Sequence, residues 1–288
     1  ATITVMLSGP PPSSATRTSR SAHSCGSTHT RSVAAITKAD RVAPESVEAV
    51  RAEVAALLAP TRLSGIPTLP VSAVTGEGIE ALKRQLSDAA GSYAARMTEG
   101  QHFRLAIDRA FTIAGSGTVV TGTVFNGAVA VGDRLVISPK GTPVRVRGVQ
   151  MRGKPAERAQ AGQRCALNLT GTDLETVARG DWVLAEAIHA PTQRLDARVT
   201  VLASESEPLE HWTPLHLHLA TADVTARVSV PKEDAIAPGA SAIVQLVLAK
   251  PVGALNGDRF ILRDQSARRT LGGGGVLAPF ARAARRAS

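Results

Sequence analysis

The sequence predicts a mixed fold, in which a short parallel α/β segment precedes two small all-β barrels. Apolar residues recur at the spacing typical of helices only before about residue 91. Short β-branched runs separated by Gly- or Pro-bearing turns fill residues 101–280. Hydrophobic residues make up 43% of the 288 residues and aromatic residues only 3%, so the cores must consist of Val, Leu, Ile and Ala, which suits small barrels.

The composition narrows the class of protein without identifying it. Residues 1–33 and the last ten residues carry six of the nine net positive charges, so bulk charge is weak evidence for nucleic-acid binding. No apolar stretch approaches the ~20 residues that span a bilayer, and the apolar start lacks the basic residues of a secretion signal. Two cysteines, Cys25 and Cys165, cannot form a disulfide framework, so we expect a cytoplasmic protein.

The first third of the chain contains two segments that differ in composition and hydrophobic periodicity. Residues 1–33 are rich in Ser, Thr, Pro, Arg and His without hydrophobic periodicity, which predicts disorder. Residues 34–91 alternate strand and helix, the order typical of a parallel sheet. The expected elements are a strand VAAIT from Val33, a helix after Pro44 with Val47, Val50, Val54 and Leu57 on one face, a strand PTLPVSA, and a helix marked by Ile79, Leu82 and Leu86.

The remaining chain divides into a linker, two all-β units and a tail. Residues 92–100 are the expected linker, and strand candidates such as VGDRLVI and QRCALNL fill 101–189. Strand candidates such as LDARVTVL and ASAIVQLVLAKPV fill 190–280, after a break at Pro191. Two consecutive all-β units of this size suit two small barrels. Residues 281–288 form a basic tail.

The run FRLAIDRAFTIAGSGTVVTG at 103–122 is the most informative part of the sequence. Phe103, Leu105 and Ile107 alternate with polar or small residues, as in a half-buried strand. AGSG supplies a tight reversal and TVVTGTV leads back. The unusual feature is the charged pair Asp108 and Arg109 directly after the apolar alternation.

This run resembles the start of the second domain of the selenocysteine-specific elongation factor, SelB, a relative of elongation factor Tu. PAERAQAGQRCALNL and RGDWVL follow in the order and spacing of that domain, and PLHLHLATADVTARV, PGASAIVQLVL and GDRFILRDQSARRTLGGGGVL resemble the third domain. The resemblance covers roughly residues 34–280. It implies that the α/β segment is the C-terminal remnant of a P-loop-type GTPase domain and that the barrels are like domains 2 and 3 of elongation factor Tu.

The resemblance also implies a binding site for the selenocysteinyl group. Within that family, the Asp-Arg pair and the Arg of the AGQR motif line the pocket, and they fall here on Asp108, Arg109 and Arg164. A selenol is largely ionised at neutral pH, so two guanidinium groups favour selenolate over the neutral hydroxyl of serine. The alternative is structural: Asp108 and Arg109 pair locally, and Arg164 caps a strand end.

Another set of candidate residues lies in the α/β segment. TKAD and, further on, VSAVTGEG each follow a predicted strand, as the base-recognition motifs of guanine-nucleotide proteins do. By that resemblance the Asp carboxylate accepts hydrogen bonds from guanine, the Lys stem packs along the base, and a backbone amide of the second loop meets guanine O6. The alternative is a surface loop and an ordinary helix start. The guanine-binding remnant comprises Thr37, Lys38, Asp40, Ser72 and Ala73.

The phosphate-binding motifs of such a domain have no counterpart in this sequence. No G-x-x-x-x-G-K-[ST] loop, Mg²⁺-holding threonine or DxxG switch precedes TKAD. Such motifs supply several charge-assisted hydrogen bonds to the phosphates, at ~1.5–3 kcal/mol each. Without them the affinity for GTP falls by many orders of magnitude. GTP and Mg²⁺ belong to the intact family, and we expect this chain neither to hold GTP usefully nor to hydrolyse it. No catalytic residue is assigned.

Other polar residues allow two interpretations each. His216 and His218 share a strand face, but a zinc site needs further ligands, for which His211 is a distant candidate, so a polar face is favoured. Two pairs of arginines, one alternating outward on the predicted strand VRVRG and one before the glycines 272–275, either contact a tRNA backbone or face solvent. These arginines are Arg145, Arg147, Arg268 and Arg269.

The resemblance implies a translation elongation factor truncated at both ends. Intact members deliver selenocysteinyl-tRNA to the ribosome at recoded UGA codons and grip an mRNA hairpin through C-terminal domains absent from this sequence. We therefore expect selenocysteinyl-tRNA and the ribosome as partners, and no membrane. One alternative is a fragment of a sister translational GTPase, a general elongation or initiation factor. The other is a non-functional product of a damaged gene, as a shifted reading frame upstream of Val33 would produce.

Overall fold

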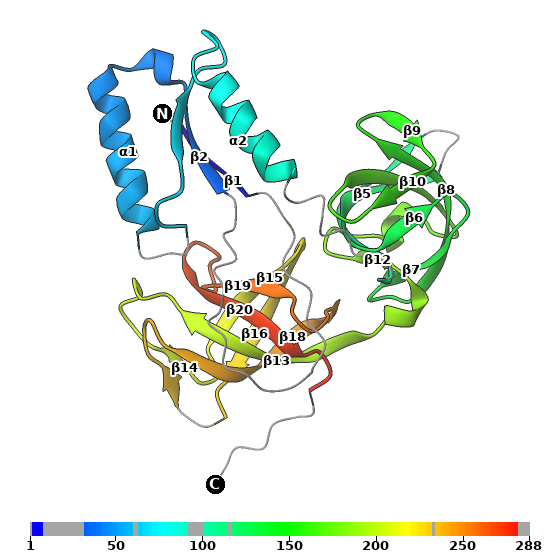
Figure 1. Cartoon of the computed structure of the whole chain (residues 1–288). Coiled ribbons are helices and arrows are strands. Elements are labelled where there is room, and N and C mark those ends of the chain that lie inside the picture. The colour runs from blue at the N-terminus through cyan, green and yellow to red at the C-terminus, as the bar shows by residue number, and fades with distance from the viewer. Residues whose placement is uncertain are drawn as a thin grey trace, which may run out of the picture. The chain divides into compact units, whose positions relative to one another are not determined.

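The structure, a computed structural model, divides the chain into two compact units, which are considered separately. The described residues of the first unit end at 91, and those of the second unit begin at 101 (Figure 1). No helix among the described residues is long and apolar enough to cross a membrane. The described residues are 2–7, 32–59, 63–91, 101–113, 117–231 and 234–281.

The first unit is a three-stranded sheet with two helices. Strand β2 lies in the middle, antiparallel to β1 and parallel to β3. The parallel pair β2 and β3 with its helices confirms the predicted α/β order. The elements are β1 (Thr2–Leu7), β2 (Ser32–Thr37), the 3₁₀ turn η1 (Ala39–Arg41), α1 (Pro44–Leu58), β3 (Thr68–Val71) and α2 (Ile79–Gly91).

Helix α1 covers the sheet with a face that differs by one residue from the predicted face. Pro44 occupies the first turn, where its missing N–H costs nothing. Val54 and Leu58 are buried with Ala34 of β2, whereas Leu57 is 69% exposed. The prediction that Leu57 faces the core is therefore wrong, because the four-residue step from Val54 leads to Leu58.

Strand β1 differs from the expected disorder of residues 1–33. It pairs with β2 over its whole length, from Thr2 opposite Thr37 to Leu7 opposite Ser32. The sequence TITVML is rich in β-branched and apolar residues, which favours a strand against the otherwise open edge of β2. Residues 8–31, the expected linker 92–100 and residues 282–288 of the expected tail lie outside the described residues.

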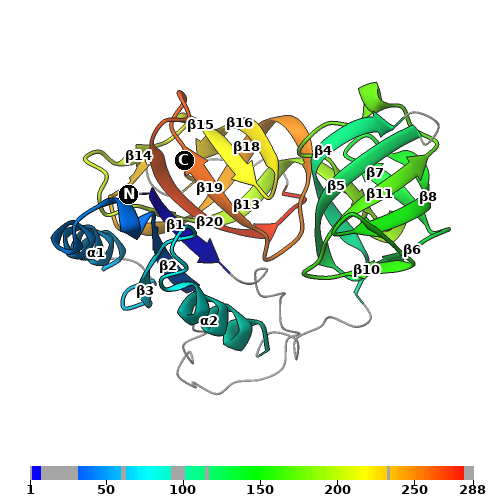
Figure 2. The ribbon, with the colours of Figure 1, turned by 90° about the horizontal axis from the view of Figure 1, so that it is seen from above.

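The second unit begins with a barrel whose strands close into a ring. The main sheet runs β11-β5-β4-β12-β7-β8-β9, and β11 also pairs with β8. Figure 2 shows β4, β5, β7, β8 and β11 in this barrel. Strands β6 and β10 form a separate ribbon, and short 3₁₀ turns, η3 (Leu174–Thr176) and η4 (Glu186–Ile188), flank β12. The strands are β4 (Arg104–Ile113), β5 (Gly117–Asn126), β6 (Ala128–Ala130), β7 (Arg134–Ser138), β8 (Thr142–Met151), β9 (Lys154–Ala156), β10 (Arg158–Gln160), β11 (Arg164–Thr170) and β12 (Trp182–Leu184).

A second closed barrel follows, with strand order β13-β18-β16-β15-β19-β20. Strand β20 passes so close to its neighbours that a Cβ on Gly274 would lie 1.9 Å from the carbonyl oxygen of Arg198, which explains the glycine run. The two barrels confirm the predicted fold class. The strands are β13 (Pro191–Val201), β14 (Leu209–Glu210), β15 (Pro214–Leu219), β16 (Ala222–Ser229), β17 (Ala235–Ile236), β18 (Ser241–Gly253), β19 (Arg259–Arg263) and β20 (Thr270–Ala278).

A buried ion pair joins the two barrels of this unit. Arg104 of β4 is 3% exposed and donates two hydrogen bonds, of 2.8 and 2.7 Å, to the carboxylate of Asp258 before β19. Its guanidinium carbon lies 3.9 Å from the ring centre of Trp182, and Phe125 meets that ring edge-on. Asp258 also accepts the backbone N–H of Leu255. The bidentate hydrogen bonds and the face of the Trp182 ring together stabilise the charge of Arg104, whose burial without partners would be unfavourable.

Removing the carboxylate of this pair is expected to destabilise the barrel unit. Asp258→Ala leaves the Arg104 guanidinium buried without its partner, which typically costs about 3–5 kcal/mol of unfolding free energy. Urea unfolding followed by tryptophan fluorescence measures the change. Glu157→Ala, at an exposed carboxylate of the first barrel, is the control and should change stability by less than about 0.5 kcal/mol. Equal unfolding midpoints for Asp258→Ala and the wild type would contradict this role.

Candidate functional site

A β-bulge in β4 creates the charged surface of the first barrel. Ile107 pairs with Gly122 of β5 and Arg109 with Thr121, so Asp108 is an extra residue in the ladder. Ile107 is buried in the barrel core, and Ala110 packs against that core, three residues later instead of two. The bulge therefore lets two consecutive charged side chains, Asp108 and Arg109, leave the interior on the outer side.

Arg164 at the start of β11 meets Asp108 on this outer side. Its Nη1 and Nη2 both donate to the Asp108 carboxylate, the second bond measuring 3.1 Å. The Thr121 hydroxyl donates to Asp108 Oδ1 at 2.7 Å, and Arg164 Nη2 lies 3.4 Å from the same hydroxyl. Asp108 thus pairs with Arg164, 56 positions away. The alternative, in which Asp108 pairs locally with its neighbour Arg109, is wrong.

The surroundings of Asp108 favour its ionised form. Partial burial acts to raise the pKa of the Asp108 carboxyl, but the hydrogen bonds from Arg164 and Thr121 and the charges of Arg164 and Arg109 outweigh it and lower the pKa. The hydrogen bond to Asp108 in turn raises the pKa of Arg164. The Arg164 side chain remains 54% exposed, so its guanidinium is accessible as well as oriented.

Arg109 supplies a further positive charge beside this pair. It is exposed, and its side chain makes no ion pair with any described residue. Two arginines and one aspartate leave the cluster with a net positive charge, which suits an anionic group. The structure thus brings all three predicted residues, Asp108, Arg109 and Arg164, to one region of the barrel surface.

Sequence reasoning missed an apolar surface next to these charges. Phe111 and Ile113, two and four residues beyond Arg109 on β4, are exposed by 39% and 44%. In a strand, residues at this spacing share one face. The signal was present in the run RAFTI, whose second apolar alternation begins after the bulge. Arg109 therefore lies between the charged side chains of Asp108 and Arg164 and an exposed apolar surface.

The predicted guanine-binding residues lie at one edge of the first unit's sheet. Thr37 ends β2 opposite Val71 at the end of the parallel strand β3, so the loops that follow both strands start side by side. Lys38 has a left-handed backbone, with φ of 60°, and both Lys38 and Asp40 are exposed.

The second guanine loop is held by a buried serine. Ser72 is fully buried, and its hydroxyl accepts the backbone N–H groups of Val74 and Thr75 at 3.2 and 3.1 Å. Ala73 between them is exposed, and its N–H has no hydrogen-bond acceptor among the described residues. An exposed, unbonded amide in a fixed loop is able to donate to a ligand oxygen.

The remaining predicted residues do not assemble into a metal site. His216 Nδ1 lies 2.7 Å from Asp223 Oδ1, and His218 Nδ1 lies 4.0 Å from the same atom. His211 is engaged elsewhere, because its Nδ1 accepts the N–H of Val230. Within the described residues, no group of three or more His, Cys, Asp or Glu side chains is placed to hold a metal ion.

The turn between β19 and β20 is a preformed hairpin that carries Arg268 and Arg269. Asp264 Oδ1 accepts the backbone N–H groups of both arginines, at 2.7 and 2.9 Å, and Oδ2 accepts the Ser266 hydroxyl. These bonds, led by that of Ser266, lower the pKa of Asp264 to about 2. Arg269 approaches Glu205 at 3.6 Å, whereas the Arg268 side chain has no ion pair within the described part of the chain.

Family models, curated relatives and a solved structure all match this chain to elongation factors. Residues 117–184 match the family described as elongation factor Tu domain 2, and residues 196–283 match the beta-barrel domain of the selenocysteine-specific elongation factor. The selenocysteine-specific elongation factors of Desulfomicrobium baculatum and Escherichia coli are 37% and 40% identical over 88% and 84% of this chain. A crystal structure of bacterial selenocysteine-specific elongation factor EF-Sec covers 88% of this chain with a TM-score of 0.74 and 30% identity.

The paired barrels and these matches define a protein with the barrel domains of the elongation factor Tu class. Within that class, the chain is homologous over most of its length to selenocysteine-specific elongation factors. It spans about two fifths of the length of the relatives it matches, 40% and 37% of the two curated proteins and 41% of the solved chain.

The Asp108 carboxyl is expected to titrate below the ordinary range of aspartate. Since its folded-state pKa is lowered, the ion pair stabilises the fold above about pH 4, and this contribution disappears as the pH falls through the folded-state pKa. Carbon-13 NMR of the carboxyl measures the midpoint. In Arg164→Gln the pKa of Asp108 should rise, because the hydrogen bonds and charge of Arg164 no longer offset the effect of burial. Arg158→Gln is the control and should leave the pKa of Asp108 unchanged. An unchanged midpoint in Arg164→Gln would contradict the pairing.

Proposed function

We propose that the outer face of the first barrel binds the selenocysteinyl end of a tRNA, as part of selenocysteine incorporation during translation. The observation that carries this proposal is the bulge at Asp108, which puts Arg109 on the same surface as Arg164. Homology to selenocysteine-specific elongation factors makes an aminoacyl-tRNA the appropriate ligand.

The charge of the cluster supplies a means of discrimination. Selenolate is an anion at neutral pH, whereas the hydroxyl of a serine residue on tRNA is neutral. The accessible guanidinium groups of Arg109 and Arg164 favour the anion. Asp108 acts as the positioning residue, because its two hydrogen bonds fix the plane of the Arg164 guanidinium.

Other surfaces of the barrel unit suit the rest of the tRNA. Phe111 and Ile113 offer apolar contact of the kind on which unpaired RNA bases stack. The β19–β20 hairpin presents Arg268 to a phosphate backbone, since Asp264 already holds its main chain. In the complete factor we infer a further partner, the ribosome; recognition of an mRNA hairpin would belong to domains outside this sequence.

The guanine-binding remnant fits a guanine base better than it fits a whole nucleotide. Asp40 and the free amide of Ala73 follow adjacent parallel strands and offer an acceptor and a donor. GTP affinity, however, comes largely from phosphate and Mg²⁺ contacts, for which the sequence provides no glycine-rich loop. We therefore infer that this chain does not hold GTP usefully.

Replacing either arginine is expected to reduce discrimination between aminoacyl groups. The wild-type chain should bind selenocysteinyl-tRNA more tightly than seryl-tRNA, and Arg109→Gln or Arg164→Gln should lower that ratio about tenfold, since a charge-assisted hydrogen bond contributes ~1.5–3 kcal/mol. Arg158→Gln, which removes an exposed charge of the same barrel, should leave the ratio unchanged. Equal affinity of the wild type for both tRNAs would refute the selenocysteine assignment and favour a sister translation factor.

A titration with a fluorescent GTP analogue in the presence of Mg²⁺ is expected to show no saturable binding in the micromolar range. The physical reason is the missing set of phosphate-binding groups, which the base-binding groups do not replace. Asp40→Asn should therefore give the same flat curve. Micromolar binding that Asp40→Asn abolishes would show instead that the base-recognition loops suffice.

A further inference from the structure

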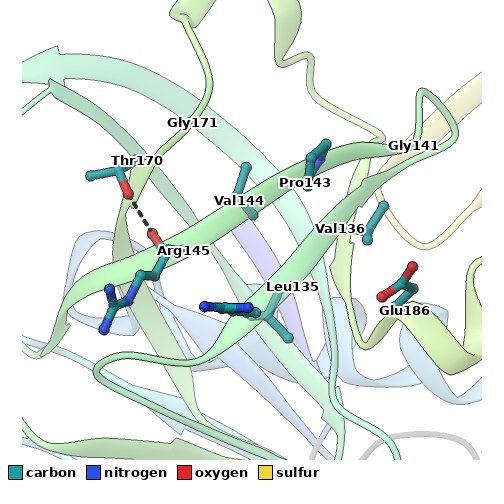
Figure 3. A pocket seen from close by; sticks show the side chains of 10 residues that line it. Leu135, Val136, Gly141, Pro143, Val144, Arg145, Thr170, Gly171 and Glu186 are labelled. Carbon is teal, nitrogen blue, oxygen red and sulfur yellow. Dashed lines mark hydrogen bonds between the residues drawn. The ribbon is translucent and has the colours of Figure 1, made fainter.

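The first barrel carries a pocket of about 460 Å³ that the aminoacyl site does not use. It lies over β7 and β8, where the end of β11 and the turn η4 close it (Figure 3). Arg164 begins β11 and Thr170 ends it, so the site and the pocket are separated by about 20 Å along that strand, at ~3.3 Å per residue. A ligand in the pocket is therefore independent of one at Arg164.

Two arginines face each other at one end of the pocket. Arg134 of β7 is directly opposite Arg145 of β8, and Thr170 of β11 is opposite Arg145 on its other side. Like charges directly opposite each other destabilise a sheet. Neither arginine forms an ion pair with any described residue, and Arg145 donates only through Nε, to the carbonyl of Gly132 at 3.3 Å. Both side chains are exposed, so their guanidinium groups are accessible to an external anion.

The other end of the pocket has a different chemistry. Beyond the pair Leu135 and Val144, Val136 lies opposite Pro143; Pro143 is exposed, Val136 is 7% exposed, and both line the pocket with apolar surface. Glu186 of η4 is exposed and has no ion-pair partner among the residues that the structure describes. Figure 3 places Arg145 and Glu186 at opposite ends. Charge, apolar surface and a hydrogen-bond acceptor thus follow one another along the pocket.

Glycines keep this pocket open. Gly171, with φ of 89°, lies at its edge, and a Cβ there would come within 3.0 Å of the carbonyl oxygen of Pro143. Gly141, with φ of 77°, ends the β7–β8 turn beside His189. Both backbone conformations suit glycine, so two walls carry no side chain that would fill the space.

We propose that this pocket binds one nucleotide of a single-stranded RNA. The phosphate lies between Arg134 and Arg145, the base rests on Val136 and Pro143, and an exocyclic amino group of the base donates to Glu186. A cavity of this size falls within the range of about 300–1,000 Å³ typical of small-ligand sites. The order of the three chemistries along the pocket is that of phosphate, ring and amino edge in adenylate or cytidylate.

Binding of a fluorescein-labelled ten-nucleotide oligoadenylate to the full chain tests the proposal. Arg134→Gln combined with Arg145→Gln should weaken binding at least tenfold. The slope of log K against log salt should become shallower by about 0.7 for each phosphate of the single strand that the variant no longer neutralises. The double variant should remain folded by circular dichroism, because it removes a repulsive pair. Arg152→Gln combined with Arg158→Gln, both exposed outside the pocket, is the charge-matched control.

An equal loss of affinity in both double variants would overturn the proposal, because it would show that bulk charge alone attracts RNA. Unchanged binding in Arg134→Gln/Arg145→Gln would overturn it as well. These outcomes are separate from those of the aminoacyl site, since the probe carries no aminoacyl group. A loss confined to the pocket variant supports the pocket whichever tRNA the barrel prefers.

Two further measurements define the ligand. Oligoadenylate should bind more tightly than oligouridylate, whose O4 would face the Glu186 carboxylate, and Glu186→Gln should reduce that preference; an unchanged preference would refute the placement of the base. Free AMP should compete only at concentrations at least a hundredfold above those of oligoadenylate. Competition by AMP at equal concentration would identify a free nucleotide, rather than RNA, as the ligand and overturn the RNA assignment.

Discussion

The buried contact among Arg104, Asp258 and Trp182 is the constraint on which the geometry of the barrel unit depends. Arg104 begins β4, the strand that four residues later carries the bulge, so the same strand anchors one barrel to the other and presents the charged surface. Ala106, between these two functions, packs with the core of the second barrel. A strand fixed at one end in this way can hold an irregularity nearby without slipping in register.

The bulge is the device that turns an ordinary barrel strand into a site. Without it, strict alternation from Ile107 would direct Arg109 into the core, where an unpaired guanidinium is not tolerated. With it, Asp108 reaches Arg164 and Thr121, while Arg109 makes no ion pair with any residue that the structure describes. The Asp108 carboxylate thus orients Arg164, and Arg109 is exposed beside them. Both results follow from the single extra residue in β4.

Much of this arrangement was predictable from sequence, and the exceptions have physical causes. The alternation of Phe103, Leu105 and Ile107 predicted β4, and the strand-helix order of residues 34–91 predicted the parallel pairing of β2 with β3. The bulge was not predictable, because it is a mismatch of register between two strands. Nor was the pairing of Arg104 with Asp258, since side-chain contacts across 154 positions leave no local periodicity.

Cys165 gives the barrel a chemical property of its own. It follows Arg164 on β11, but it points inward, and burial raises the pKa of its thiol to about 11 despite the adjacent guanidinium. A thiol reacts chiefly as its thiolate, which is scarce in such a buried group at neutral pH. The strand that presents the Arg164 guanidinium to solvent therefore keeps the neighbouring sulfur inside the barrel, protonated and unreactive.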